Sequence, residues 1–211
     1  MTAAEPGRVQ RPGQQRAEAT RDLLYQAAAA LFVEQGYENT TMAEIAQRAR
    51  TSRRTAFNHF PSKSDIPMRW VRRMADLAID VTGAPECDQA TERIRGYFRF
   101  ISEMVEAEPE LSAQMLLGWT AAAGPIRYES QLLADLTPML QEGQARGQID
   151  AAADAATIAR TLSDILMGAS FRWVREGDDG PSLQELVEAG IDLVLRAIQS
   201  GRPQQPNHQL R

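Results

Sequence analysis

Residues 40–65 read TTMAEIAQRARTSRRTAFNHFPSKSD, and this stretch predicts two short helices joined by a tight turn. Thr41 followed three residues later by Glu44 is the pattern of a capping box, in which each residue satisfies an amide of the other. The apolar residues that follow recur at the spacing of one buried helical stripe: Met42, Ile45, Ala46 and Ala49. The first short helix is therefore expected to begin just after Thr41.

The second short helix is expected to begin at Ser52, a second N-cap residue three positions past that stripe. The gap leaves room for a turn of three or four residues, which holds two helices at a steep angle. Ala56 and Phe60 lie four residues apart and should face inward. The residues left facing outward are Arg53, Arg54, Thr55 and Asn58. Because the first residues of a recognition helix reach base edges in the major groove, the stretch predicts a DNA-binding helix-turn-helix.

The distribution of charge favours the same interpretation. Residues 48–73 contain eight basic residues and a single acid, whereas residues 74–211 contain 11 basic and 21 acidic residues. The net charge of the whole chain is −5, which by itself would not indicate nucleic acid. The local positive field does, although a short arginine-rich helix can also be a solvated surface.

This stretch resembles the DNA-binding domain of the TetR family of bacterial transcriptional regulators. The resemblance covers about residues 18–66 and rests on Gly36-Tyr37, Thr40-Thr41, Ile45-Ala46, Ala49, Ser52, Thr55, Phe57, His59-Phe60 and Pro61-Ser62-Lys63. The rest of the chain is similar to that family only in length and helical character. The resemblance implies that this remainder is a divergent ligand-binding and dimerisation domain.

The resemblance also implies particular DNA contacts, namely base or phosphate contacts at the start of the second short helix and phosphate contacts at His59 and Lys63. Two positions depart from the family pattern. Arg50 stands in the turn where glycine is usual, and a left-handed arginine costs about 1 kcal/mol unless the turn differs or a phosphate compensates. Phe57 replaces the usual tyrosine and lacks the hydroxyl that would bond a phosphate, which leaves packing as its alternative role. The predicted DNA-contact set is Thr41, Arg50, Thr51, Arg53, Arg54, Thr55, Phe57, Asn58, His59 and Lys63.

Length and composition set the domain plan. The 211 residues, 43% of them hydrophobic, can bury one sizeable core and one small module. We expect a disordered basic arm at 1–16, the helix-turn-helix domain at 17–66, a helical ligand-binding and dimerisation domain at 67–200, and a disordered tail at 201–211. The basic arm could touch DNA or remain a solvated tail.

The expected compartment is the bacterial cytoplasm. No apolar run approaches the roughly 20 residues of a membrane span, and the N-terminal arginines and prolines do not read as a signal peptide. The single cysteine, Cys87, excludes an internal disulfide and a thiol-only zinc site.

The predicted fold is all-α, with about nine helices and no strand. Besides the two short helices, helical periodicity covers residues 17–35, 62–81, 88–107, 109–123, 125–146, 152–176 and 182–200.

The last two predicted helices carry long apolar stripes and are expected to form a homodimer. Small residues on both would allow close approach, and two helices from each of two chains would make a four-helix interface. The alternative is a core within one chain; the resemblance favours the dimer, which could read a palindromic operator. The predicted interface residues are Leu162, Ile165, Leu166, Ala169, Trp173, Leu186, Val187, Gly190, Ile191, Val194 and Ile198.

A pocket for a small apolar or aromatic molecule is expected in the larger domain, although each candidate could equally be plain core. The candidate lining residues are Phe98, Ile101, Met104, Met115, Trp119, Tyr128 and Phe171. No residue pattern indicates a cofactor, a metal site or a catalytic group. The sequence thus predicts a ligand-responsive transcriptional repressor. The alternatives are an activator, a helical module whose basic face binds an acidic protein, and a helical enzyme that converts a small molecule.

Overall fold

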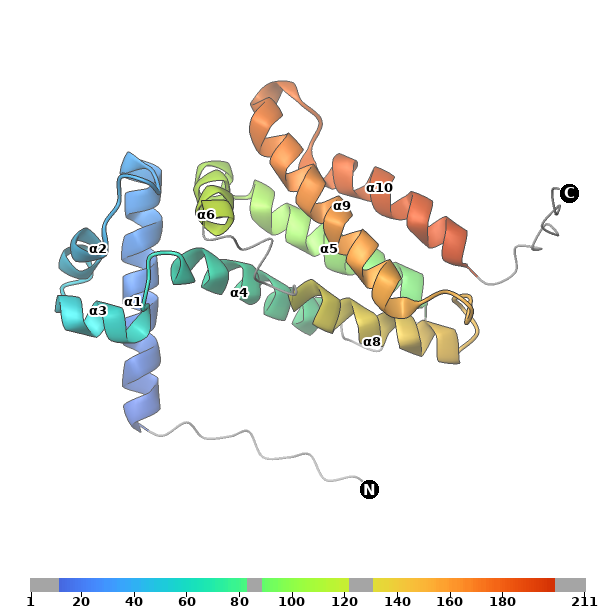
Figure 1. Cartoon of the computed structure of the whole chain (residues 1–211), viewed down its shortest axis with the longest axis horizontal. Coiled ribbons are helices and arrows are strands. Elements are labelled where there is room, and N and C mark those ends of the chain that lie inside the picture. The colour runs from blue at the N-terminus through green and yellow to red at the C-terminus, as the bar shows by residue number, and fades with distance from the viewer. Residues whose placement is uncertain (1–11, 83–88, 122–130, 200–211) are drawn as a thin grey trace, which may run out of the picture. The chain divides into compact units, whose positions relative to one another are not determined.

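The computed structural model describes residues 12–82, 89–121 and 131–199 (Figure 1). Within these ranges the chain forms nine α-helices and one short 3-10 helix, Gly177–Asp179, and it contains no β-strand. An isolated bridge between Ile149 and Gln199 is the only β-type pairing in this described part. The predicted all-α fold is confirmed.

The chain divides into two compact units. The first takes in the chain up to Arg69 together with Ala113–Ala122, and the second takes in Trp70–Ser112 and the chain from Ala123 onward. The first boundary lies close to the predicted one at residue 66. The grouping of 113–122 with the N-terminal unit was not expected from the sequence.

The first unit is built around one long helix. Its elements are α1 (Pro12–Gln35), α2 (Met42–Arg48), α3 (Arg53–His59), the start of α4 (Asp65–Thr82) and the end of α6 (Pro109–Ala121). Figure 1 shows α2 and α3 lying against α1. Apolar residues of α1 that recur at helical spacing are buried: Leu24, Ala27, Ala28, Leu31 and Phe32. Residues 12–16, predicted to be disordered, are helical, and proline suits the first position of a helix because it needs no amide donor there.

The beginning of α4 is tied to α1 by charge. Arg69 Nη2 lies 2.6 Å from Glu18 Oε1 and 2.8 Å from Asp22 Oδ1. The helix begins at Asp65 rather than at the predicted Ser62, because the Ser62 amide and hydroxyl both donate to the Asp65 carboxylate in the manner of a cap.

The second unit is a bundle of long helices that lie side by side in Figure 1: α5 (Ala90–Glu106), α8 (Gln131–Ala145), α9 (Ala155–Glu176) and α10 (Leu183–Ile198). Helix α5 contacts α8 and α10, and α9 contacts the same two helices. Apolar residues of α5 that recur at helical spacing form part of the core: Ile94, Phe98, Ile101 and Val105. Next to it, the buried Tyr97 hydroxyl donates to Asp135 Oδ2 on α8 at 2.8 Å, and burial together with this carboxylate raises the pKa of Tyr97.

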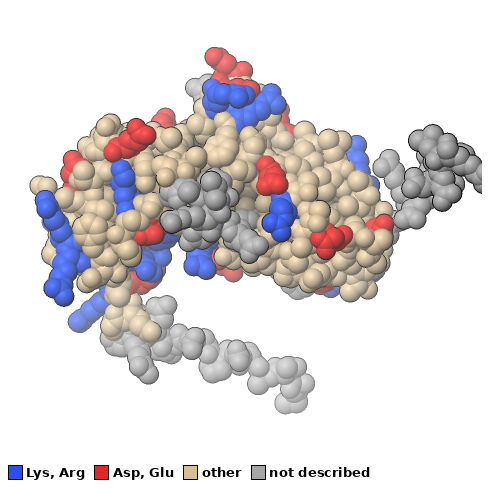
Figure 2. Space-filling view, viewed as in Figure 1, with Lys and Arg blue, Asp and Glu red and all other residues tan. Residues whose placement is uncertain are grey.

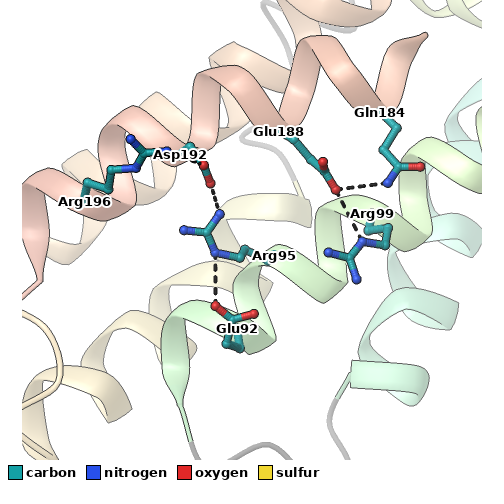
Figure 3. Close-up of polar contacts among 7 residues, drawn as sticks. All are labelled: Glu92, Arg95, Arg99, Gln184, Glu188, Asp192 and Arg196. Carbon is teal, nitrogen blue, oxygen red and sulfur yellow. Dashed lines mark hydrogen bonds and ion pairs between the residues drawn. The ribbon is translucent and has the colours of Figure 1, made fainter.

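Ion pairs connect α5 to α10 along their length (Figure 3). Arg95 pairs with Asp192, and Arg99 Nε lies 3.4 Å from Glu188 Oε1. At the end of α5, the Glu106 carboxylate accepts the first amides of α10, where the positive end of the helix dipole favours an acid. Because the partner number on α10 falls as the number on α5 rises, the two helices are antiparallel.

No helix in the described ranges is both long and apolar enough to cross a membrane.

Candidate nucleic-acid interface

Helix α2 is capped as the sequence predicts. The Thr41 hydroxyl accepts the Glu44 amide at 3.3 Å, and Glu44 Oε2 accepts the Thr41 amide at 2.8 Å. The Thr41 hydroxyl also lies 2.7 Å from the same carboxylate and donates its proton to it. These bonds hold the pKa of Glu44 below its usual value. The one proton of the Thr41 hydroxyl is thus given to Glu44, and because a DNA phosphate only accepts hydrogen bonds, a phosphate contact by Thr41 would require a rearrangement of the cap.

The turn between α2 and α3 keeps its left-handed residue although that residue is arginine. Arg50 has φ 52°, and its amide bonds to the Gln47 carbonyl at 3.0 Å. The next amide, of Thr51, bonds to the Ala46 carbonyl at 2.9 Å, which closes the end of α2. Arg50 thus adopts the conformation that glycine usually occupies, and its side chain is exposed.

The start of α3 is held by Ser52. Its hydroxyl accepts the Thr55 amide at 3.0 Å and lies 2.8 Å from the Thr55 hydroxyl. Ala56 and Phe60 are buried, with 0% and 2% of their surface exposed. The opposite face consists of Arg53, Arg54 and Asn58, all exposed, with Thr55 half-buried at its edge. This is the division between inner and outer face that the spacing predicts.

Only part of the predicted basic cluster remains available on this surface. Arg48 forms a two-point ion pair with Glu34 on α1, and Lys63 bonds to backbone carbonyls. The exposed arginines without a partner in residues 48–63 are Arg50, Arg53 and Arg54. Figure 2 shows basic side chains projecting from the surface over α2 and α3. A cationic face of this kind attracts a polyanion.

Two further predicted contacts stay untested. Phe57 on α3 is 48% exposed, so it does not serve as plain core. His59, the last residue of α3, is half-buried beside it. Both lie on or near the face that carries the exposed arginines.

Lys63 is placed differently from the prediction. Its ammonium group donates to the carbonyls of Tyr37 at 2.6 Å, Thr40 at 2.8 Å and Glu38 at 3.2 Å. An ammonium group has three protons, and all three are used. This geometry does not support the predicted phosphate contact.

Comparison with known proteins identifies the N-terminal part of the chain. Residues 24–66 match the family described as bacterial regulatory proteins, tetR family. The chain thus resembles the TetR family over this N-terminal stretch. The matched residues run from α1 through α2 and α3 into α4, the part of the chain whose geometry is described above.

The curated relatives share different parts of the chain. The HTH-type transcriptional regulator TcmR of Streptomyces glaucescens is 42% identical over 91 residues, which make up 42% of this chain and 39% of TcmR. The alignment therefore spans less than half of that relative.

Solved structures share the fold over most of the chain. The TetR-family repressor FadR of Thermus thermophilus, in complex with lauroyl-CoA, gives a TM-score of 0.65 at 23% identity over 88% of this chain and 98% of FadR. The complex of SmeT with triclosan gives 0.65 at 20% identity over 92% and 99%. SmeT is the repressor of a multidrug efflux pump in Stenotrophomonas maltophilia. At these identities the likeness shows the fold alone.

The seven predicted pocket residues do not all belong to one unit. Phe98 and Ile101 are buried in the second unit, whereas Met115 and Trp119 are buried in the first. Met104 and Phe171 are 39% and 38% exposed, and Tyr128 lies outside the described residues. Met104 departs from the pattern because six residues after Phe98 it lies about 240° further round α5.

The predicted dimer surface on α9 and α10 needs a correction. Most of its residues are buried inside the single chain: Leu162, Leu166, Ala169, Val187, Ile191 and Ile198. They form the core between α9, α10 and their neighbours, which is the alternative that the sequence left open. The partly exposed members are Ile165, Trp173, Leu186, Gly190 and Val194.

A different apolar set on the same two helices is exposed and was missed. Leu193 on α10 is 71% exposed, and Phe171 and Val174 on α9 are each 38% exposed. Gly190 lies close to α9 within the chain, because a Cβ there would lie 2.5 Å from Ile165 Cγ2. The described residues contain no cluster of three or more side chains that could hold a metal ion.

Proposed function

We propose that this chain is a homodimeric transcriptional repressor of bacterial cytoplasm that binds a palindromic operator through α3 and is released by a small apolar or aromatic molecule. The observation that carries the proposal is the exposed pair Arg53 and Arg54 at the capped start of α3. Arginine at this position of a recognition helix can form two hydrogen bonds to guanine in the major groove. Arg50, in the adjoining turn, adds positive charge that suits a phosphate.

The dimer is proposed because α3 is short. Its seven residues, Arg53–His59, can contact only a few base pairs. Two copies related by a two-fold axis would read two half-sites in successive major grooves, about 34 Å apart. The exposed apolar residues of α9 and α10 would supply the surface between the copies, with Leu193, Phe171 and Val174 at its centre.

The proposed effector class is supported by two relatives of the same fold. FadR was solved with lauroyl-CoA and SmeT with triclosan, and both proteins are repressors. An effector can lower operator affinity only by its differential affinity for the two shapes of the protein, typically about 1–3 kcal/mol.

The test of the function is the selection of bound duplexes from a random pool with the purified full chain. We expect a palindromic consensus whose half-site centres are separated by about one helical turn. Failure to enrich any sequence at low ionic strength would contradict the proposal. A reporter gene behind the selected operator should fall in expression when the protein is present; a rise would make the protein an activator.

Arg53 is tested by its replacement with alanine. We expect Arg53→Ala to weaken binding to the selected duplex by roughly 1–3 kcal/mol and to relax the preference for one base pair in each half-site. A mobility-shift titration measures both effects on the consensus and on duplexes mutated at single positions. Unchanged affinity would remove Arg53 from the interface.

A further inference from the structure

The turn after α1 is a meeting point of hydrogen bonds within the first unit. Gly36 ends α1 with φ +86°, a left-handed conformation, and directs the chain into Tyr37. The Tyr37 ring is buried, with 6% of its surface exposed, and packs edge-on against Phe32 at 5.1 Å between ring centroids. The backbone carbonyls that follow point toward one cation.

That cation is Lys63, which links this turn to the segment between α3 and α4. Besides its three carbonyl acceptors, the Lys63 ammonium group stands 4.2 Å from the centroid of the Tyr37 ring. A cation over an aromatic face is stabilised by the ring quadrupole. Lys63 lies four residues after the end of α3, so its position and the direction of the recognition helix are closely connected.

Helix α6 holds the other side of Tyr37. Gln114 Oε1 accepts the Tyr37 amide at 2.7 Å. Gly118, one turn further along α6, approaches so closely that a Cβ there would lie 2.5 Å from the Tyr37 ring and 2.8 Å from Pro67 Cγ on α4. Both contacts lie within the first unit. No part of this arrangement is needed to bind DNA directly.

We propose that Tyr37 is a positioning residue through which α6 controls DNA affinity. This inference rests on the proposed function. Gln114 and Gly118 fix the amide and ring of Tyr37, and Tyr37 in turn fixes Lys63 through its carbonyl and its ring. A shift of α6 changes the position of Lys63 and thereby the orientation of α3 toward DNA. Lys63 acts through the protein backbone, not through a phosphate.

The first experiment places a methyl group in the contact. Gly118→Ala should weaken binding to the selected duplex by about tenfold or more, because a Cβ at 2.5 Å forces the Tyr37 ring to move. Gly96→Ala is the matched control, since this glycine also lies inside a helix and its Cβ would meet only Thr82 Cγ2 at 3.4 Å. Affinity is compared at a temperature where circular dichroism shows every variant fully folded. Equal affinity of the two variants would overturn the proposal.

The second experiment asks whether the methyl group acts through Tyr37. In a Tyr37→Leu background the ring is absent and the contact with Pro67 remains, so adding Gly118→Ala should reduce affinity much less than it does in the wild-type background. Gln114→Leu, which removes the acceptor of the Tyr37 amide, should weaken binding in the wild-type background, whereas Gln141→Leu on the exposed face of α8 should not. If the losses of DNA affinity at positions 37 and 118 simply multiply in the double variant, the proposed coupling between them is refuted.

The third experiment separates positioning from phosphate binding at Lys63. Lys63→Gln should lower affinity while the slope of log affinity against log salt stays that of the wild type. A slope reduced by about 0.9 would assign one phosphate to Lys63 and overturn its role here. If the wild-type chain itself binds no duplex, the proposed function fails. If the wild type binds and Gly118→Ala binds with the same affinity, only the inference about Tyr37 fails.

Discussion

Arg50 occupies a backbone conformation that few side chains other than glycine adopt. At φ 52° its Cβ crowds the following carbonyl oxygen, which costs roughly 1–2 kcal/mol. The turn nevertheless retains the amide bonds that end α2, so the folded structure carries this cost. An ion pair between the exposed Arg50 side chain, which lies close to Arg53, and a DNA phosphate would offset this cost.

Arg50→Gly should therefore separate stability from affinity. We expect the free energy of unfolding to rise by up to about 1 kcal/mol, because glycine relieves the crowding but also adds freedom to the unfolded chain. Urea unfolding measures the first effect and mobility-shift titration the second. DNA affinity should fall and the salt slope should decrease by about 0.9 if Arg50 neutralises one phosphate. A more stable variant with unchanged affinity would show that Arg50 does not touch DNA.

At the scale of elements, the short helices depend on their caps. Helix α2 has only seven residues, too few to be stable alone, and the capping box between Thr41 and Glu44 satisfies two of its unpaired amides. The bonds from Thr41 hold the pKa of Glu44 below the usual value of a glutamate. A depressed carboxyl pKa contributes stability above the unfolded value, and that contribution is lost as the pH falls through the folded value.

Glu44→Gln tests this cap through pH. The variant should be less stable than the wild type at pH 7. The difference should shrink as the pH falls below the ordinary glutamate pKa of about 4.3 and through the lower pKa of the folded state, where the wild-type carboxylate also becomes protonated. Thermal unfolding of both proteins between pH 7 and pH 3 measures it. A difference that is constant across this range would mean that the charge of Glu44 contributes nothing.

Helices α9 and α10 pack closely against each other at Gly190. Gly190→Ala would bring a Cβ within 2.5 Å of Ile165 Cγ2, and overpacking of this kind typically costs about 1–3 kcal/mol. Removing the opposing atoms with Ile165→Ala should abolish most of that cost in the double variant. Gly96→Ala is again the control. Additive losses at positions 190 and 165 would show that the two residues do not contact each other.

The whole molecule raises the question of assembly. Leu193 on α10 is 71% exposed, and Phe171 and Val174 add apolar surface on α9. Leu193→Glu should convert the proposed dimer to a monomer and lower affinity for the palindromic duplex by about 100-fold, because the two half-sites are then bound separately. Sedimentation equilibrium gives the mass, with Gln141→Glu on α8 as the control. A dimer that persists in Leu193→Glu would place the interface elsewhere.

The sequence predicts local features well and distant ones poorly. Caps, helix periods and the inner face of α3 follow from neighbouring residues, and the structure confirms them at Thr41, Ser52 and Ala56. Burial of Leu162 or Val187 depends on which helix packs against which face, and periodicity alone cannot tell a core within one chain from a surface between two. The position of the Lys63 ammonium group likewise depends on backbone carbonyls more than 20 residues away in the chain.

The role of α6 was missed for the same reason. An isolated glycine inside a helix often marks close packing, so Gly118 carried a usable signal. Its partner Tyr37 is 81 positions away in the chain, and no short-range pattern connects them. The candidate pocket residues are divided between the two units, and the sequence could not show this because apolar character does not reveal which unit a side chain joins.

The membership of residues 113–122 in the N-terminal unit has a practical consequence for protein engineering. A chimera that grafts residues 12–69 onto a foreign sensor would leave the amide of Tyr37 without its acceptor and one side of its ring without a neighbour. Such a graft should inherit the operator preference of α3 but lose potency. A chimera that keeps its DNA affinity would also need Gln114 and Gly118, placed four residues apart on a helix as they are in this chain.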